Sequence, residues 1–319
     1  MTMLDNFREA RGLLLAAAAI AALIAAIGFI YLRQQQFVDA IAVVDITGSM
    51  NARDGGMSNV PVARIDAAKT AIRDLAQSLP CGSRIGLGIF TERRSFLLFG
   101  PADVCESYEA FDGAVSQLDW RMAWEGDSYV AKGLYDAVAI ADSLKSNLLF
   151  FTDGQEAPPL PASGVPDFEG KIGLVKGLIV GMGGTAKVPI PKFDDDGREI
   201  GVYAVGDVPH VNRHGLPGKD MASAVGWHPR NAPQGGDLVV GEEHLTSMRG
   251  EHLKELAART GLTFVDLASA PRLDRSLLNV ANLRSEPVLR SAAVFPAALA
   301  LALATALYTF GLAARLKYR

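Results

Sequence analysis

Hydrophobic residues along the chain follow two patterns that alternate over most of its length. Continuous apolar runs, which are typical of buried parallel strands, occupy residues 37–46, 147–152, 171–180 and 262–267. Apolar residues three and four positions apart, which predict amphipathic helices, recur over residues 64–79, 107–118, 130–144 and 245–260. Strands that alternate with helices favour a doubly wound α/β fold with a mostly parallel sheet.

Two short apolar runs, at residues 84–90 and 95–100, are joined by a polar stretch and predict a hairpin with one antiparallel edge strand. The only two cysteines of the chain, Cys81 and Cys105, flank this hairpin. If the hairpin turns within the polar stretch, the two thiols face each other at its base and form a disulfide. Such a bond persists only in an oxidising compartment. The alternative is a pair of buried free thiols.

Two longer apolar blocks, Gly12–Leu32 and Ser291–Ala314, contain no charged residue and no histidine. A transmembrane helix needs roughly 20 apolar residues. We therefore expect transmembrane helices at residues 12–32 and 291–314, flanking the α/β fold. The first block also fits a cleaved secretory signal, but its apolar run exceeds the usual length of about 7–15 residues, which favours a retained anchor.

Basic residues on the short outer flanks of these blocks predict their orientation in the membrane. The flanking residues are Arg8, Arg11, Arg315, Lys317 and Arg319. Since such flanks usually stay cytoplasmic, residues 1–11 and 315–319 should be cytoplasmic and the central domain extracytoplasmic. The bias is weakened by Arg33, Arg284 and Arg290 on the opposite side.

The segment between the two blocks is long enough for one domain, which we expect at residues 37–270. Residues 189–240 are rich in Gly, Pro and charged residues and are interpreted as an insertion, whereas residues 271–290 are expected to form a linker helix. The chain has 31 Lys and Arg against 35 Asp and Glu, and it contains no Lys/Arg-rich stripe. This balance excludes a generic nucleic-acid binder.

Oxygen-bearing side chains follow two of the predicted strands and precede one predicted helix. The residues are Asp45, Thr47, Ser49, Ser128 and Asp153. Because ligands of open α/β sheets bind at the carboxyl ends of the strands, we expect these side chains to converge there. Carboxylates and hydroxyls without thiolates suit a hard divalent cation, Mg²⁺ or Ca²⁺. The alternative is a purely structural role, in which Asp45 and Ser49 cap a helix and Asp153 lies in a turn.

Catalytic alternatives fail on the residues themselves. An aspartyl-phosphate phosphatase needs a second Asp where this chain has Thr47, and an aspartic protease needs contiguous Asp-Thr-Gly, which Ile46 interrupts. A hydrolase that activates water on a metal is disfavoured because no histidine flanks the site in the sequence. We therefore expect no enzymatic activity and name no catalytic residue.

The three loops resemble the metal-ion-dependent adhesion site (MIDAS) of von Willebrand factor A (vWA) domains. That site reads Asp-x-Ser-x-Ser on its first loop, with a Thr on the second and an Asp on the third. Asp45, Thr47 and Ser49 match the first loop, Ser128 stands for the Thr, and Asp153 matches the third loop. The two departures, Thr47 and Ser128, keep the hydroxyl. The resemblance implies that a protein partner's carboxylate completes the metal shell.

Residues 37–267 further resemble membrane-anchored bacterial vWA proteins of the Bat type. Asp45–Asp54 and Asp119–Ser128 are similar to accessory proteins of methanol oxidation, the MxaL/MxaC type. This likeness implies a two-pass inner-membrane protein with a periplasmic vWA domain. It would assist maturation of calcium-dependent methanol dehydrogenase and bind that enzyme or its assembly factors. The alternative is a Bat-like scaffold that works with a MoxR-type ATPase.

Aromatic and acidic residues next to the second loop are candidates for partner contact. Trp120 and Trp124 precede that loop, and aromatic residues often anchor interfaces. Both tryptophans are equally compatible with a place in the core. Asp127 is either a third carboxylate of the site or a cap of the following helix, and we favour the cap.

Overall fold

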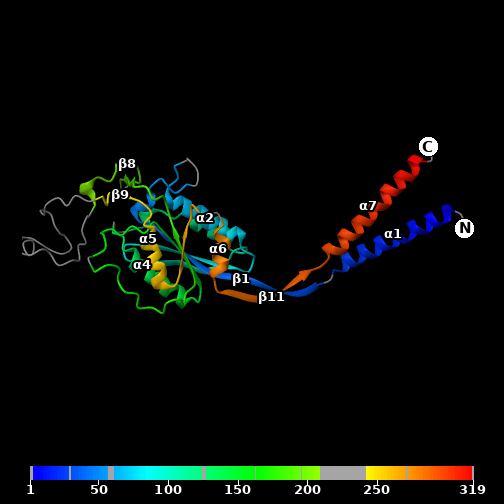
Figure 1. Cartoon of the computed structure of the whole chain (residues 1–319), viewed down its shortest axis with the longest axis horizontal. Coiled ribbons are helices and arrows are strands. Elements are labelled where there is room, and N and C mark those ends of the chain that lie inside the picture. The colour runs from blue at the N-terminus through cyan, green and yellow to red at the C-terminus, as the bar shows by residue number, and fades with distance from the viewer. Residues whose placement is uncertain are drawn as a thin grey trace, which may run out of the picture. The chain divides into compact units, whose positions relative to one another are not determined.

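The computed structural model of the chain describes residues 3–28, 30–56, 61–123, 127–161, 163–194, 196–208, 242–270 and 272–317 (Figure 1). The chain divides into two compact units. The larger one is Phe37–Arg284, and the smaller one combines Met1–Gln36 with Ser285–Arg319.

The core of the larger unit is a mixed β-sheet in which parallel pairing dominates. The strands, in their order across the sheet, are β10 (Thr263–Asp266), β5 (Gly177–Gly181), β4 (Asn147–Thr152), β1 (Ile30–Asp45), β2 (Arg84–Thr91) and β3 (Arg94–Asp103). All of these neighbours pair in parallel except β2 and β3, which are antiparallel. The predicted α/β fold with an antiparallel strand at one edge is confirmed.

Helices cover both faces of this sheet (Figure 1). One face packs against α2 (Arg64–Ser78), α3 (Tyr108–Ser116) and α6 (Leu273–Val280). The other face packs against α4 (Val130–Ser143) and α5 (Gly250–Thr260). Alternate residues of β1 serve the two layers: Val44 belongs to the first core and Val43 to the second. Burial on both faces explains why residues 40–44 of β1 are all apolar, rather than alternating between apolar and polar residues.

Short elements complete the larger unit. They are η1 (Gly48–Asn51), η2 (Trp120–Met122), η3 (Val205–Asp207), β6 (Val188–Pro189), β7 (Pro191–Phe193), β8 (Glu199–Val202) and β9 (Leu245–Thr246). Strand β6 pairs with β9, and β7 with β8, each in antiparallel fashion. The predicted insertion therefore has a two-stranded base, β6–β9, and carries the hairpin β7–β8.

Three predicted boundaries are wrong. Strand β5 starts at Gly177 rather than at residue 171, because Gly173 has a positive φ of 74° and turns the chain. Helix α5 starts at Gly250 rather than at residue 245, because the preceding residues form β9. The expected linker helix at residues 271–290 is instead α6 followed by a strand, β11 (Leu283–Ser291). Pro287 lies within β11 and would break a continuous helix there.

The smaller unit contains two long helices, α1 (Met3–Ile27) and α7 (Val294–Lys317), which pack against each other (Figure 1). Side-chain hydrogen bonds from Ser285 to Gln34 and from Arg290 to Gln35 join the two chain segments next to the helices. Residues 30–32, expected at the end of the first transmembrane helix, belong to β1. Among the residues that the structure describes, no helix reaches the length and hydropathy required of a membrane span.

The predicted disulfide is present. Cys81 and Cys105 are bonded, with their Cα atoms 5.2 Å apart, at the open end of the β2–β3 hairpin. The pairing of Arg84 with Asp103 brings the two cysteines to the same end of the hairpin. The alternative of two free thiols is therefore wrong.

Replacing both cysteines with serine should destabilise the protein only when the disulfide can form. The bond closes a loop with a sequence separation of 24, which corresponds to about 3 kcal/mol in the chain-entropy treatment. We expect the double variant Cys81→Ser/Cys105→Ser to have a lower Tm than the wild type without reductant and an equal Tm in dithiothreitol. An equal loss in both conditions would assign the effect to packing of the side chains.

Candidate functional site

The first loop of the site begins where β1 ends. Asp45, the last residue of β1, is completely buried, because β1 lies between β2 and β4. Its Oδ1 accepts hydrogen bonds from the Thr47 backbone N–H at 2.9 Å and from Thr47 Oγ1 at 2.7 Å. Ser49 Oγ lies 3.4 Å from Thr47 Oγ1, within the short helix η1. The carboxylate thus organises the turn that presents both hydroxyls.

The third loop is bonded directly to the first. Thr152, the last residue of β4, donates from Oγ1 to Asp45 Oδ2 at 2.6 Å. Asp153 Oδ1 accepts from the Gln155 backbone N–H at 3.0 Å, which closes a tight turn. Gly154 in this turn has a φ of 78°, and a Cβ there would lie 2.8 Å from the Leu253 side chain. A side chain at Gly154 would therefore be both strained and crowded.

The second loop is fixed to the third by its backbone. Ser128 N–H donates to Ala157 O at 2.6 Å, and Ala157 N–H donates to Ser128 O at 2.8 Å. The Ser128 hydroxyl is buried and has no hydrogen-bond partner within the described part of the chain. Leaving a buried hydroxyl unbonded costs about 1–3 kcal/mol. A ligand from outside the chain that bonds to this oxygen would remove that cost.

Asp153 has a further partner that the sequence did not indicate. Arg64, the first residue of α2, is completely buried and places Nη1 2.5 Å from Asp153 Oδ2. The same guanidinium makes two bonds to Asp54, Nε to Oδ1 at 2.6 Å and Nη2 to Oδ2 at 2.8 Å. A basic residue at the start of an amphipathic helix normally faces water, and Arg64 and Asp153 are 89 positions apart. No local pattern in the sequence connects them.

The buried surroundings of Asp45 change the pKa of its carboxyl group. Burial, followed by the nearby negative charge of Asp153, raises the pKa of Asp45 from 3.8 to about 7, against the lowering effect of its hydrogen bonds from Thr152 and Thr47. For Asp54 burial would raise the pKa, but the hydrogen bonds from Arg64 and from the Gly184 backbone N–H hold it below its usual range. Asp45 is thus the carboxylate whose charge is poorly compensated.

The donor set fits a hard divalent cation. Asp45, Thr47, Ser49, Ser128 and Asp153 are all buried and come from three loops that hydrogen bonds hold together. Within the described ranges, no three His, Cys, Asp or Glu side chains gather as a metal cluster. A cation here would be held by hydroxyls and two carboxylates, a set without soft ligands. It would relieve the repulsion between Asp45 and Asp153 and give Ser128 Oγ a partner.

The structure describes two of the three residues that were expected to contact a partner, Trp120 and Asp127. Trp120 is half-buried and stacks on Phe193 of β7, with ring centroids 5.2 Å apart. It therefore contacts the insertion hairpin of its own chain, and Trp124 lies outside the described residues. Asp127 is not the cap of α4: Glu156 Oε1 accepts the hydrogen bond of the Ala131 backbone N–H, at 2.9 Å, in the first turn of that helix.

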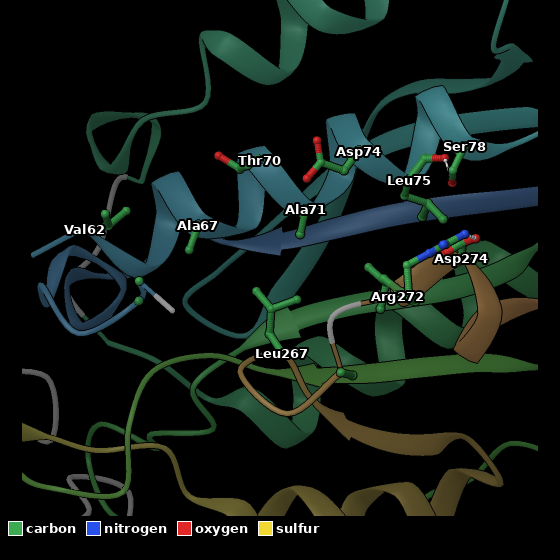
Figure 2. A pocket seen from close by; sticks show the side chains of 14 residues that line it. Val62, Ala67, Thr70, Ala71, Asp74, Leu75, Ser78, Leu267, Arg272 and Asp274 are labelled. Atoms are coloured by element: carbon green, nitrogen blue, oxygen red, sulfur yellow. Dashed lines mark hydrogen bonds and ion pairs between the residues drawn. The ribbon is translucent and has the colours of Figure 1, made fainter. Parts of the chain in front are cut away.

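A separate groove of about 590 Å³ lies between α2 and the segment that follows β10 (Figure 2). Ala67, Ala71 and Leu75 line it from α2, and Leu267 lines it from the opposite side. Thr70, Asp74 and Ser78 lie along the same helix. None of the predicted metal ligands lines this groove, so it is distinct from the three-loop site.

The raised pKa of Asp45 predicts how the stability of the metal-free protein depends on pH. Because the pKa is higher in the folded state, the protonated form favours folding, and its contribution to stability is complete below pH 3.8 and is lost as pH rises through about 7. In EDTA, Asp45→Asn should therefore gain stability relative to the wild type across this window, by up to about 1.4 kcal/mol per pH unit. Denaturant unfolding at several pH values measures the difference.

The control for this experiment is Asp142→Asn, which removes a solvent-exposed carboxylate on α4. Its stability relative to the wild type should change little between pH 4 and pH 7. Saturating Mg²⁺ should reduce the gap between the wild type and Asp45→Asn, since a cation replaces the proton at the site. A gap that does not vary with pH would show that Asp45 is not titrating in this range.

Comparison with known proteins yields one family match and no curated relative. Residues 40–155 match the family model described as the von Willebrand factor type A domain. All five predicted ligands of the cation, from Asp45 to Asp153, lie within the matched segment. No curated protein matches the chain.

Solved structures with a similar arrangement include two from Bacteroides. An aerotolerance-related membrane protein from Bacteroides fragilis is 14% identical, with a TM-score of 0.46; the alignment covers 76% of this chain and 97% of that one. The conserved hypothetical protein BatB from Bacteroides thetaiotaomicron is 15% identical, with a TM-score of 0.45 and coverage of 75% and 95%. The resemblance to von Willebrand factor A domains is supported at the level of the domain by the family match over residues 40–155 alone.

Proposed function

We propose that this chain is a protein-interaction module, without enzymatic activity, whose vWA domain binds a partner through Mg²⁺ or Ca²⁺ held by the three loops. The observation that carries the proposal is the buried Ser128 hydroxyl, which lacks a hydrogen-bond partner in the described structure. The backbone of Ser128 is bonded to the third loop, and Thr152 of that loop bonds to the buried carboxylate of Asp45. Buried polar atoms are nearly always satisfied. A cation would satisfy this oxygen and neutralise the excess negative charge in one step.

The hydrogen bonds of the first loop suit its hydroxyls as direct ligands. Thr47 Oγ1 donates its proton to Asp45 Oδ1, so its lone pairs remain available to a cation. Ser49 and Ser128 supply two further hydroxyls, and Asp45 and Asp153 supply the negative charge. A cation at this position would offer a coordination site to an oxygen of the partner, and a carboxylate is the natural choice for a hard ion.

Asp45 is poorly suited to act as a general base, although its pKa is close to neutral. It is completely buried, and three donors, two from Thr47 and one from Thr152, already bond to its two oxygens. A general base must reach the proton that it removes, directly or through one water molecule. This arrangement supports binding rather than catalysis.

We further propose that the chain is anchored in the bacterial inner membrane by its two uncharged apolar segments, with the vWA domain in the periplasm. The support comes from the sequence. Residues 12–27 and 294–314 fall in long helices and contain no charged side chain. The Cys81–Cys105 disulfide supports an oxidising compartment. Membrane lipid would then be a second partner of the chain.

The partner that we favour is methanol dehydrogenase or one of its assembly factors, on the likeness of Asp45–Asp54 and Asp119–Ser128 to methanol-oxidation accessory proteins. The alternative partner is a MoxR-type ATPase in a Bat-like scaffold. Pull-down of the detergent-solubilised chain from methanol-grown and control cultures, with Mg²⁺, Ca²⁺ or EDTA, separates them. Recovery of a quinoprotein dehydrogenase only from methanol-grown cells supports the first, and recovery of an ATPase on both carbon sources supports the second.

Removal of single ligand oxygens tests the metal-mediated mechanism. Asp45→Ala should abolish binding of Mg²⁺ and Ca²⁺ in isothermal titration calorimetry and should abolish capture of the partner. Ser128→Ala should weaken cation binding by about tenfold, the effect of losing about 1.4 kcal/mol, while a control at the exposed Ser116 should bind normally. Partner capture that survives in Asp45→Ala and in EDTA would reject the mechanism.

Asp153→Ala is a less direct test because of its ion pair. Removing this carboxylate leaves the buried Arg64 without one of its two acidic partners. Breaking a buried ion pair on one side costs about 3–5 kcal/mol. We therefore expect Asp153→Ala to lose the cation and also to lower the Tm, whereas Asp45→Asn, which keeps an oxygen acceptor, should lose the cation without lowering the Tm, as circular dichroism and thermal unfolding would show.

A further inference from the structure

Arg64 lies where the candidate cation site meets the two ends of the insertion. We define the insertion base as residues 183–189 and 244–249, which lead into and out of the insertion and include β6 and β9. Arg64 Nη1 donates to Thr246 Oγ1 at 2.8 Å, in addition to its bond to Asp153. One buried guanidinium thus contacts a predicted ligand of the cation and a residue of the insertion base.

Asp153 itself is bonded to the same base. Its Oδ2 accepts a second hydrogen bond, from Thr246 Oγ1 at 3.0 Å, and its backbone carbonyl accepts from the Arg249 N–H at 2.8 Å. Arg64 Nη1, Thr246 Oγ1 and Asp153 Oδ2 therefore form a closed, buried triangle of hydrogen bonds. The position of the Asp153 carboxylate depends on the insertion base staying in place.

The other end of the insertion base reaches Arg64 from the opposite side. The Gly184 N–H donates to Asp54 Oδ2 at 2.9 Å, and Asp54 is bonded to the Arg64 guanidinium. Gly183 has a φ of 85°, and a Cβ there would lie 2.2 Å from Arg64 Nε. The backbone packs this closely against the guanidinium only because residue 183 is a glycine. Met248 N–H, which donates to Gly184 O at 2.8 Å, ties the two ends together.

We infer that Arg64 is a positioning residue that couples cation binding at the three loops to closure of the insertion base. When the base opens, Asp153 loses the bonds from Thr246 and Arg249, and its carboxylate is no longer held in the site. A cation that needs Asp153 in place therefore binds the closed state better than the open one. Coupling between two such equilibria is reciprocal, so the bound cation suppresses opening of the base.

This inference rests on the proposed function, because it requires a cation at Asp153. With the cation bound, the insertion base, which carries the β7–β8 hairpin, would stay closed. The conformation of the insertion base would then depend on whether the cation is bound. Arg64 and Thr246 are the side chains that transmit the effect.

Hydrogen exchange of the full detergent-solubilised chain measures the coupling. The reporters are the Met248 and Arg249 amides, whose acceptors are Gly184 O and Asp153 O. In the wild type, saturating Mg²⁺ should slow their exchange relative to EDTA by about fivefold or more, the lower end of typical coupling between two sites. Peptides from α3 serve as an internal reference and should exchange equally in both conditions.

Two variants and one control distinguish coupling from simple stabilisation. Thr246→Val keeps the side-chain shape but removes the hydroxyl of the triangle, and Arg64→Lys keeps the charge but cannot bond to Asp54 and Asp153 together. Both should still bind Mg²⁺ in calorimetry yet lose most of the Mg²⁺-dependent protection. Thr260→Val removes a buried hydroxyl that bonds only to the backbone of α5 and should behave like the wild type.

The outcomes separate this inference from the proposed function. A wild type that binds neither Mg²⁺ nor Ca²⁺ overturns both. A wild type that binds the cation without slowing exchange at Met248 and Arg249 overturns only the coupling, as does equal protection in Thr246→Val and the wild type. If Arg64→Lys fails to fold, the comparison of Thr246→Val with Thr260→Val decides the question alone.

Discussion

Two carboxylates, Asp45 and Asp153, are completely buried at the carboxyl edge of the central sheet, and the surrounding loops are arranged around them. Burial of like charges is costly, and the raised pKa of Asp45 reflects that cost. Each carboxylate is held in a different way. Asp45 is bonded by neutral donors, Thr47 and Thr152, whereas Asp153 forms an ion pair with the guanidinium group of Arg64. The bond from Thr152 to Asp45 joins the third loop to the first.

The sequence predicted the parts of this arrangement that follow from local pattern. The parallel sheet could be predicted because residues 40–44 of β1 and 148–151 of β4 are buried on both faces and are therefore continuously apolar. The site loops could be predicted because Asp45 is the last residue of β1 and Asp153 immediately follows β4. The hairpin and its disulfide followed from two short apolar runs between Cys81 and Cys105.

The contacts that the sequence did not predict are those between distant segments. Arg64 has the surroundings of an ordinary first residue of an amphipathic helix, and only the tertiary fold brings Asp54, Asp153 and Thr246 to its guanidinium. Residues 245–249 continue the apolar spacing of α5, but the backbone N–H groups of Met248 and Arg249 bond to Gly184 and Asp153, and the helix starts at Gly250. In both cases a local preference gives way to partners that lie far away in the sequence.

The buried charges also bear on which cation the site would accept. Asp54 and Asp153 bond to the single guanidinium of Arg64, whereas Asp45 is bonded by the neutral donors Thr47 and Thr152. The three carboxylates and the arginine therefore carry two negative charges together when Asp45 is ionised. One divalent cation neutralises that charge, whereas a monovalent cation leaves one negative charge in a buried environment, where it is costly. If Arg64 were neutral, three carboxylates would remain uncompensated and the loops would repel one another more strongly. The buried arginine therefore offsets part of the negative charge of the three loops, and under the proposed function a divalent cation would neutralise the rest.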